Sequence, residues 1–243
     1  MITVEIWSDV VCPWCYIGKR RFEQALATFE GDVEVVWRSF QLDPEAPARE
    51  EGGFAESFAA RKGFGVDQVR AMFANVTEVA AGEGLAYDFD RVRGTNTFDA
   101  HRLLHFAAAH GRQGELKERL LRAYFTEGEQ LGDPEVLARL AAEVGLDAEQ
   151  ARRALDGGAH ADDVRADIDT ARAFGVTGVP FFVFDRRIGV SGAQSTEVFT
   201  RALEMAREQT ADGSSGAGAA PGASTADPHG AAGHACDDDH CAV

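Results

Sequence analysis

The spacing of apolar residues divides the chain into strand-like segments near both ends and a long helical segment between them. Residues 3–8 and 33–40 are rich in branched and aromatic side chains, which favour strands. Between them, apolar side chains from Cys15 onward recur at helical spacing, and the predicted helix ends near Gly31. This order of elements is typical of a βαβ unit, which Asp43-Pro44 closes.

A helical pattern follows and continues from about residue 54 to residue 175. Thr97 can cap a helix that begins at Phe98, and Asp133 stands directly before a proline, as an N-cap residue often does. Three glycines mark helix ends, namely Gly111, Gly145 and Gly157. We therefore predict four or more helices in this segment.

The strand pattern returns after Gly175. Residues 179–184 and 188–191 read as two strands joined by a turn at Asp185-Arg186, which predicts a hairpin. Ser195 can then cap a last helix that runs to about residue 209.

Residues 210–243 contain no Leu, Ile, Phe, Tyr or Trp. Such a segment cannot bury enough apolar surface to offset the entropy of ordering it, so we expect a disordered C-terminal tail. The pattern as a whole predicts an α/β protein with three parts. Residues 1–43 and 176–209 form one domain, residues 44–175 form an all-helical insertion domain, and residues 210–243 form the flexible tail.

Composition narrows the possible partners and location. The 243 residues carry a formal net charge of −16, with a pI near 4.8, and this disfavours binding to nucleic acid, whose affinity comes from clustered Lys and Arg. No stretch approaches the roughly 18 consecutive apolar residues of a membrane span. The N-terminus also lacks a basic region followed by an apolar one. We expect a cytoplasmic protein that binds neither membrane nor nucleic acid.

The four cysteines form two widely separated pairs. Cys12 and Cys15 enclose Pro13 and Trp14, whereas Cys236 and Cys241 lie in the tail. No cysteine stands between the pairs, so the pattern does not resemble the disulfide framework of a small secreted domain. We expect these thiols to serve reaction or metal binding.

The first pair has the arrangement of a redox site. A strand precedes Cys12, and the helix that follows begins at the motif, with Pro13 suited to its first turn. The helix dipole stabilises a thiolate at that end, so we expect the pKa of Cys12 to be lowered and Cys12 to be the nucleophile. Cys15 lies one turn further and can resolve the mixed disulfide. The alternative, half of a zinc site, lacks a second half nearby.

Three segments carry a family resemblance. Residues 8–15, the helical insertion and residues 175–181 resemble DsbA-type oxidoreductases of the thioredoxin superfamily, specifically their FrnE-like cytoplasmic branch, and the resemblance extends from residue 1 to about 209. It implies a thioredoxin-like fold in which Pro180 is cis and stands beside the active-site disulfide, while the backbone of Val179 pairs with a substrate peptide. From the sequence alone, a proline that opens a strand is equally compatible with a structural turn.

Other polar residues near these motifs have two interpretations each. Asp9 is either a proton acceptor for Cys15 or a capping or loop carboxylate, and the second is favoured. Asn96 lies in a stretch that resembles one near the thiol pocket of this branch and of its glutathione-using isomerase relatives, although helix capping explains it equally well. His101 and His105 share a helix face, but no third ligand has suitable spacing. We assign no metal ligand and expect no cofactor.

The tail pair matches a C-x4-C pattern that FrnE-like proteins carry in a C-terminal extension. Three aspartates between Cys236 and Cys241 should raise the pKa of both thiols by repulsion. The pair therefore serves as an auxiliary redox centre, as a metal site together with nearby histidines, or in neither role.

These observations favour a thiol-disulfide oxidoreductase that reduces or isomerises protein disulfides. Its catalytic residues would be Cys12, Cys15 and Pro180, and its substrate-binding residues Pro13, Trp14, Val179 and Asn96. The partners would be protein or peptide disulfides, with glutathione as a further candidate, and the protein would be a monomer or dimer. Two alternatives stay open. One is a glutathione-dependent isomerase of the 2-hydroxychromene-2-carboxylate type, and the other is a redox or metal sensor that uses the tail.

Overall fold

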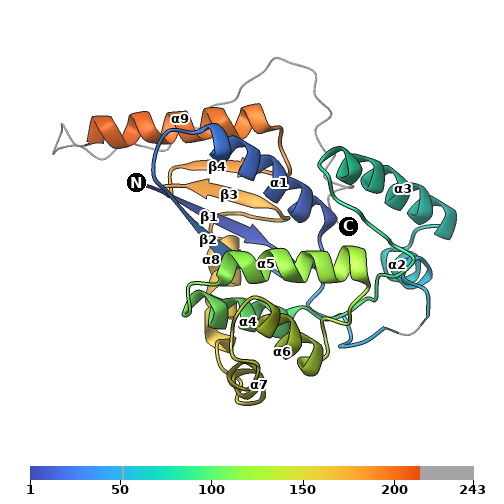
Figure 1. Cartoon of the computed structure of the whole chain (residues 1–243). Helices are drawn as coiled ribbons and strands as arrows, with labels where there is room; N and C mark the ends of the chain where they lie inside the picture. The colour runs from blue at the N-terminus through green and yellow to red at the C-terminus, as the bar shows by residue number, and fades with distance from the viewer. Residues whose placement is uncertain (51, 214–243) are drawn as a thin grey trace.

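The computed structural model describes residues 1–50 and 52–213, and the strands in this part of the chain form one mixed sheet (Figure 1). The strands are β1 (Ile2–Ser8), β2 (Val33–Ser39), β3 (Phe181–Phe184) and β4 (Ile188–Ser191), in the sheet order β2-β1-β3-β4. β1 is parallel to β2 and antiparallel to β3, and Ile6 is opposite both Trp37 and Phe182. The predicted strands and hairpin are confirmed, and the two termini of the domain meet in one sheet.

Side chains alternate between the two faces of the sheet, as strand geometry requires. Ile2, Val4 and Ile6 of β1 belong to a core that includes α1 (Pro13–Thr28) and α9 (Thr196–Gly213). Trp7 points to the other face, where its indole N–H donates to the Asp167 carbonyl of α8 (Ala161–Ala173) at 2.9 Å. Helices therefore cover both faces of the sheet (Figure 1).

Aromatic rings fill the space between the sheet, α1 and α9. The rings of Phe182 and Phe199 lie 4.5 Å apart, and the ring of Phe22 lies 5.4 Å from Phe182. All three side chains are almost fully buried. Burying each ring contributes roughly 2 to 3 kcal/mol to stability, so this cluster fixes α1 on the sheet.

The helical segment between β2 and β3 is confirmed and contains more helices than the minimum predicted. In addition to α8, it comprises α2 (Phe54–Lys62), α3 (Val66–Gly82), α4 (Phe98–Ala108), α5 (Gln113–Arg122), the π-helical turn η1 (Ala123–Glu127), α6 (Pro134–Glu143) and α7 (Ala148–Asp156). The Asp133 side chain accepts a hydrogen bond from the Glu135 N–H at 2.9 Å, so the predicted cap of α6 is confirmed.

The predicted cap of α4 is wrong. The Thr97 side chain makes no capping hydrogen bond, and the side-chain oxygen Oδ1 of Asn96 instead accepts from the Phe98 N–H at 2.9 Å. Asn96 performs this role one residue earlier because its longer side chain reaches forward across Thr97, in the manner of an Asx turn.

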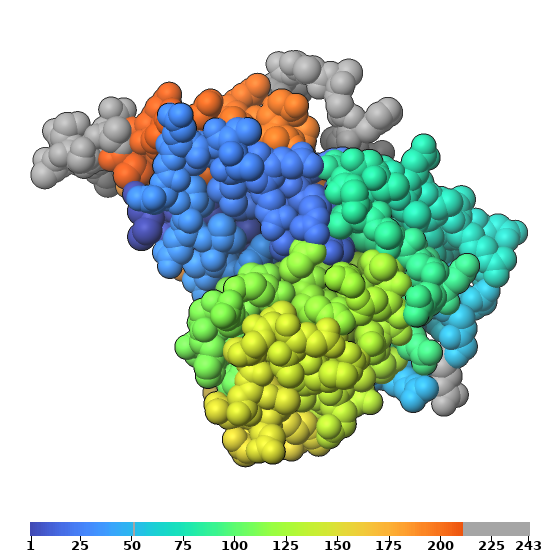
Figure 2. All heavy atoms as spheres, viewed as in Figure 1, coloured from blue at the N-terminus to red at the C-terminus, as the bar shows by residue number. Residues whose placement is uncertain are grey.

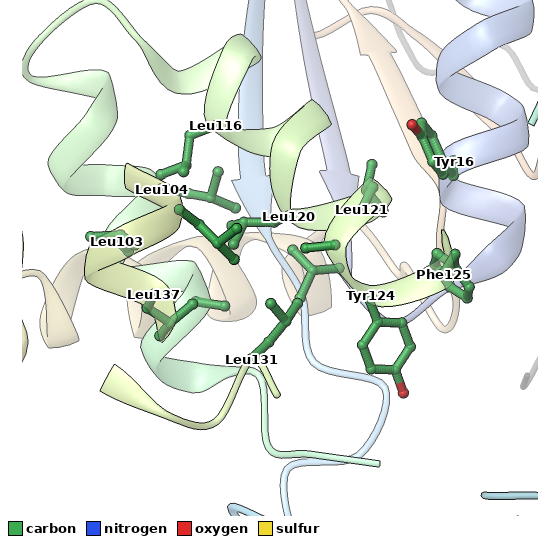
Figure 3. Close-up of a cluster of buried hydrophobic side chains, with 14 of the residues drawn as sticks. Tyr16, Leu103, Leu104, Leu116, Leu120, Leu121, Tyr124, Phe125, Leu131 and Leu137 are labelled. Carbon is green, nitrogen blue, oxygen red and sulfur yellow. The ribbon is translucent and has the colours of Figure 1, made fainter. Parts of the chain in front are cut away.

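Leucines from three helices form the centre of the helical segment (Figure 3). They are Leu103 and Leu104 of α4, Leu116 and Leu120 of α5, and Leu137 of α6. Tyr16 of α1 and Phe125 of η1 belong to the same buried cluster. The core of the helical segment therefore continues up to the helix that begins at the cysteine motif.

The described part of the chain has the predicted α/β, thioredoxin-like fold with a large helical insertion. In the space-filling view, the insertion, drawn green to yellow, packs directly against the blue N-terminal residues (Figure 2). Its division from the sheet domain at residues 43 and 176 stays a prediction, because α8 packs on the sheet and α1 shares the helical core. α9 extends to Gly213, beyond the predicted end, and most of the predicted tail lies outside the described residues. None of the described helices has the length and apolar character needed to cross a membrane.

Candidate active site

Cys12 occupies the N-cap position of α1, with extended backbone angles, φ −91° and ψ 115°. Pro13 takes the first helical position, where its missing N–H costs no helical hydrogen bond. The Cys15 N–H donates to the Cys12 carbonyl at 3.1 Å, so the two thiols lie within one turn. Both cysteines are free thiols and both are buried. The predicted position of the pair at a helix start is confirmed.

The segment before β3 lies against Cys12, although 167 residues separate them in sequence. The Cys12 thiol donates to the Val179 carbonyl at 3.5 Å. The peptide bond between Val179 and Pro180 is cis, as the resemblance implies. This places the backbone of Val179 and the ring of Pro180 at the start of α1.

Gly18 makes the close approach of Pro180 possible. A Cβ atom at this position would lie 3.1 Å from Cγ of Pro180 and 3.4 Å from Ala193. Any larger side chain would push the segment away from α1 and from the cysteines. Sequence reasoning missed this role, since a single glycine within a helical pattern gives no sign of what packs against it.

The predicted substrate-binding residues lie in different surroundings. Pro13 is buried, and its carbonyl accepts from the Tyr87 hydroxyl at 2.7 Å. Trp14 is half-buried and packs against both the helical core and the cluster that contains the cysteines. The amide nitrogen of Asn96 donates to the carbonyls of Pro44 and Ala46. Among the described hydrogen bonds, those of Asn96 connect loops and cap α4, and none reaches the thiols.

A buried polar cluster lies directly before and beside the cysteines. One Asp9 oxygen accepts from the Leu42 N–H at 2.9 Å, and the other lies 3.2 Å from Nε2 of His101. Asp9 thereby holds the loop after β2, which agrees with its interpretation as a loop carboxylate. Lys117 of α5 is fully buried near this cluster. Within the described residues, His101 Nδ1, Lys117 Nζ and the Ser8 hydroxyl have no hydrogen-bond partner at ordinary geometry.

The sequence alone did not single out Lys117 as part of this site. The residue stands in a charged stretch about a hundred positions after the cysteines, and lysines in such stretches are usually exposed. The sequence gives only a weak indication that Lys117 is buried. It lies close to the apolar residues Leu116, Leu120 and Leu121 of the same helix.

Charges in this cluster oppose the cost of burial. Burial raises the pKa of a carboxyl group, yet hydrogen bonding and the charge of His101, with the Leu42 N–H, keep the pKa of Asp9 below its ordinary value. Burial likewise opposes ionisation of Cys15. The hydrogen bond from Cys12 and the charge of Lys117 nevertheless lower the pKa of Cys15.

The predicted lowering of the pKa of Cys12 itself is wrong for this buried arrangement. Burial raises the pKa of Cys12 well above its ordinary value, and the neighbouring Cys15 raises it further. The helix start contributes only about 0.3 to 2 kcal/mol, which is less than the cost of burying a charge away from water. The two thiols therefore titrate together, and ionisation of Cys15 opposes ionisation of Cys12.

Both histidines that share a face of α4 lie against acidic side chains. His101 contacts Asp9, and Nε2 of His105 lies 3.0 Å from Asp167 and 3.1 Å from the Ser39 hydroxyl. Over residues 1–50 and 52–213, no three metal-ligating side chains gather at one point. Cys236 and Cys241 lie outside the described residues.

An apolar groove borders the cysteine motif on the side of the helical segment. Val11 and Pro13 line it next to the motif, and among its charged residues Arg61 pairs with Asp43 at 3.2 Å. The remaining wall is mainly apolar and includes Leu42, Ala46, Phe54, Phe58, Phe89 and Tyr124. A groove of this kind can receive an apolar side chain next to the cysteines.

The arrangement of sheet, helical insertion, cysteine pair and adjoining cis-proline segment is that of the thioredoxin class of proteins. More narrowly, residues 3–204 match the DSBA-like thioredoxin domain, so the chain belongs to this family.

The chain is also similar to individual proteins. The crystal structure of a probable DsbA oxidoreductase from Streptomyces coelicolor is 46% identical, with a TM-score of 0.81 over 86% of this chain and 91% of that chain. The uncharacterized protein YwbO of Bacillus subtilis is 28% identical over 83% of this chain and 96% of its own length. The cytosolic disulfide reductase DsbM of Pseudomonas aeruginosa shares the fold at 18% identity and a TM-score of 0.59, over 85% of this chain and 99% of that chain.

Proposed function

We propose that this chain is a thiol-disulfide oxidoreductase that reduces or isomerises protein disulfides, with Cys12 as nucleophile and Cys15 as resolving thiol. One observation carries the proposal: Cys12 stands at the start of α1 against the Val179 backbone, with Cys15 one turn deeper. A substrate strand that pairs with Val179 would bring its disulfide to Cys12 first.

The reaction proceeds by two exchanges. The Cys12 thiolate attacks one sulfur of a substrate disulfide, a mixed disulfide forms, and the other substrate sulfur leaves as a thiolate that takes up a proton. Cys15 then attacks the Cys12 sulfur and releases the second substrate thiol. While both thiols are buried the charge is favoured on Cys15, so transfer of a proton from Cys12 to Cys15 produces the attacking thiolate. When substrate binding exposes Cys12 to water, the thiol of Cys12 ionises more easily and its pKa falls.

The substrate would be an extended peptide. Val179 offers backbone groups to the peptide chain, and the groove beside Val11 and Pro13 is suited to an apolar side chain near the disulfide. Pro180 and Trp14 would complete the contact surface around the sulfurs. Glutathione is the natural reductant of such a pair in a cytoplasm, which is the compartment we propose.

Reduction of insulin by the full chain, in the presence of a dithiol, tests the proposal. Cys12→Ser should abolish turnover, and Cys15→Ser should trap a mixed disulfide that mass spectrometry detects. Full activity in Cys12→Ser would contradict the proposal. A glutathione-dependent isomerase of the 2-hydroxychromene-2-carboxylate type has no need of Cys15. Isomerisation of such a carboxylate that survives Cys15→Ser and needs only glutathione would therefore favour that alternative.

The tail pair is assigned an auxiliary redox role within the same proposal. Deletion of residues 214–243 should leave the exchange activity of Cys12 and Cys15 in place and should alter only the rate at which the pair is reoxidised or reduced. Complete loss of activity would instead mean that Cys236 and Cys241 do the primary work.

A further inference from the structure

Lys117 is a buried charge that the steps above do not use. Its side chain has no exposed surface, and its ammonium has no hydrogen-bond partner in the described part of the chain. Burial of an unpaired ammonium costs free energy, and an attractive interaction with a nearby negative charge would offset part of this cost.

Contacts on either side of Lys117 fix its direction. One turn earlier on α5, the Gln113 side chain accepts from the Trp37 N–H at 3.1 Å and donates to the Trp37 carbonyl at 2.9 Å. The Lys117 ammonium itself lies 5.6 Å from the centre of the Trp37 ring. Residues 113 and 117 therefore face the sheet together.

The next residue ties the same helix to α1. Glu118 accepts from the Tyr16 hydroxyl at 2.5 Å and from the Lys19 ammonium at 2.6 Å. α5 is thus held against β2 and α1 at once, and it passes beside the first turns of α1 (Figure 1). Lys117 lies on α5 between Gln113 and Glu118, and the charges of Cys15 and Asp9 act on its buried ammonium.

We infer that Lys117 is a positioning residue that stabilises the thiolate of Cys15 and thereby sets how readily the cysteine pair is reduced. The inference rests on the proposed function, because it assigns a role within the same site. Four charged or titratable groups act on Lys117: Cys15, Asp9, Cys12 and, with opposing effect, Lys19. The ammonium attracts the charge on Cys15 in surroundings where water does not screen it.

The protonation of Lys117 suits this role. Burial lowers the pKa of Lys117 to about 8, and the charges of Cys15 and Asp9 oppose this lowering. The side chain is therefore mostly charged near neutral pH and becomes neutral in mildly alkaline solution.

The same charge acts in the resolving step. The Cys15 thiolate attacks the Cys12 sulfur, the bond between Cys12 and the substrate sulfur breaks, and the substrate leaves as a thiolate that takes a proton from water. Stabilisation of the Cys15 thiolate raises the fraction of the pair that is ready for this step at neutral pH. It also stabilises the reduced form relative to the disulfide, which carries no charge.

Lys117→Met and Lys117→Gln in the full chain test the inference. We expect the apparent pKa of the reduced pair, followed by the ultraviolet absorbance of the thiolate, to rise by about one unit, which is a tenfold loss of thiolate below that pKa. The equilibrium with glutathione at neutral pH should shift by up to about tenfold toward the oxidised protein. The shift should disappear in acid, where the thiols of both proteins are protonated.

Two variants serve as controls. Arg207→Met removes an exposed charge on α9, and Leu116→Val disturbs packing on α5 while it keeps the ammonium. Both should leave the thiolate titration unchanged. An unchanged titration in both Lys117 variants, or an equal shift in Leu116→Val, would overturn the inference. Failure of the proposed function is distinguishable, because it would appear as a lack of insulin reduction by the unaltered protein.

Discussion

Two buried ionic clusters adjoin β1, and they differ in how completely their groups are paired. In the first, Glu5 accepts from Arg38 at 2.6 Å and from Arg186 at 2.7 Å, and Arg38 also reaches Asp167 at 3.2 Å. Both arginines remain partly exposed, so water can hydrate the guanidinium N–H groups that do not contact Glu5. This cluster ties β1 to β2 and to the hairpin turn.

The second cluster is closed to water and incompletely paired. Asp9 and His101 contact each other, while Lys117 has no hydrogen-bond partner among the described residues. Charged groups that are fully hydrogen-bonded and partly solvent-exposed are typical of a structural cluster. Charged groups that are buried and lack hydrogen-bond partners are more typical of a functional site. By this contrast Glu5 stabilises the fold, and the second cluster contains Lys117, for which we infer a role at the cysteines.

The largest expected effect comes from Asp9. Asp9→Ala leaves His101 and the Leu42 N–H without a partner in a site that excludes water, and removal of one member of a buried pair costs about 3 to 5 kcal/mol. Urea unfolding of the oxidised protein should show a loss of this size. Asp9→Asn, which keeps a carbonyl acceptor for Leu42, should lose less. A loss below about 1 kcal/mol in Asp9→Ala would mean that the two clusters do not differ.

Lys117→Met should have the next largest effect on the free energy of unfolding, and it should stabilise the protein where Asp9→Ala destabilises it. Because the pKa of Lys117 is lowered to about 8 from 10.5, the unfolded chain binds more protons between these values, and stability should rise with pH across this window. Removal of the charge should therefore stabilise the reduced protein by roughly 1 to 3 kcal/mol at pH 7. The gain should shrink toward pH 10.5. Unfolding curves at several pH values would measure it, and a uniform gain would contradict it.

Glu5→Gln should have a smaller effect, about 1 kcal/mol, because the amide still accepts one hydrogen bond and the arginines can turn to water. Hydrogen bonds and charges of Arg186 and Arg38 outweigh burial and lower the pKa of Glu5. Its contribution is therefore present above the ordinary value of 4.5 and is lost as pH falls through the folded value. The variant should lose less stability on acidification than the natural chain, and its thiolate titration should not move.

The smallest effect is expected for Tyr87→Phe. The change removes the hydrogen bond to the Pro13 carbonyl but leaves the ring in its buried position, at a cost of about 0.5 to 1.5 kcal/mol. Insulin reduction should stay within about twofold of the natural rate, since the cysteines keep their charges. A larger fall in activity than in stability would show that Tyr87 belongs to the second cluster.

Much of the fold was predictable because local patterns determine it. Alternating and helical spacing located all four described strands and the helical segment, and Asp133 marked a helix start by its own hydrogen-bonding capacity. The cap of α4 was misassigned to Thr97 because the two adjacent residues both have capping side chains and sequence does not tell which of them turns inward.

The electrostatics of the site could not be predicted in the same way. A helix start favours a thiolate wherever it occurs, but the degree of burial of Cys12 depends on Val179 and on the helical segment. The position of Lys117 likewise follows from how α5 docks on Trp37 and Tyr16, and no local pattern encodes that docking. Local chemistry was readable, whereas the sign of the pKa change on each sulfur depended on contacts between distant segments.

The position of β1 inside the sheet, next to the late strand β3, affects the order in which the new chain can fold. β1 is made first, yet its neighbour β3 is made only after the helical segment, so one edge of β1 stays open while most of the chain emerges from the ribosome. Throughout that interval Cys12 lacks the Val179 carbonyl, which stands 167 positions later. The open edge of β1 and the Cys12 thiol thus obtain their partners from the same late segment, which is the C-terminal hairpin and the residues directly before it.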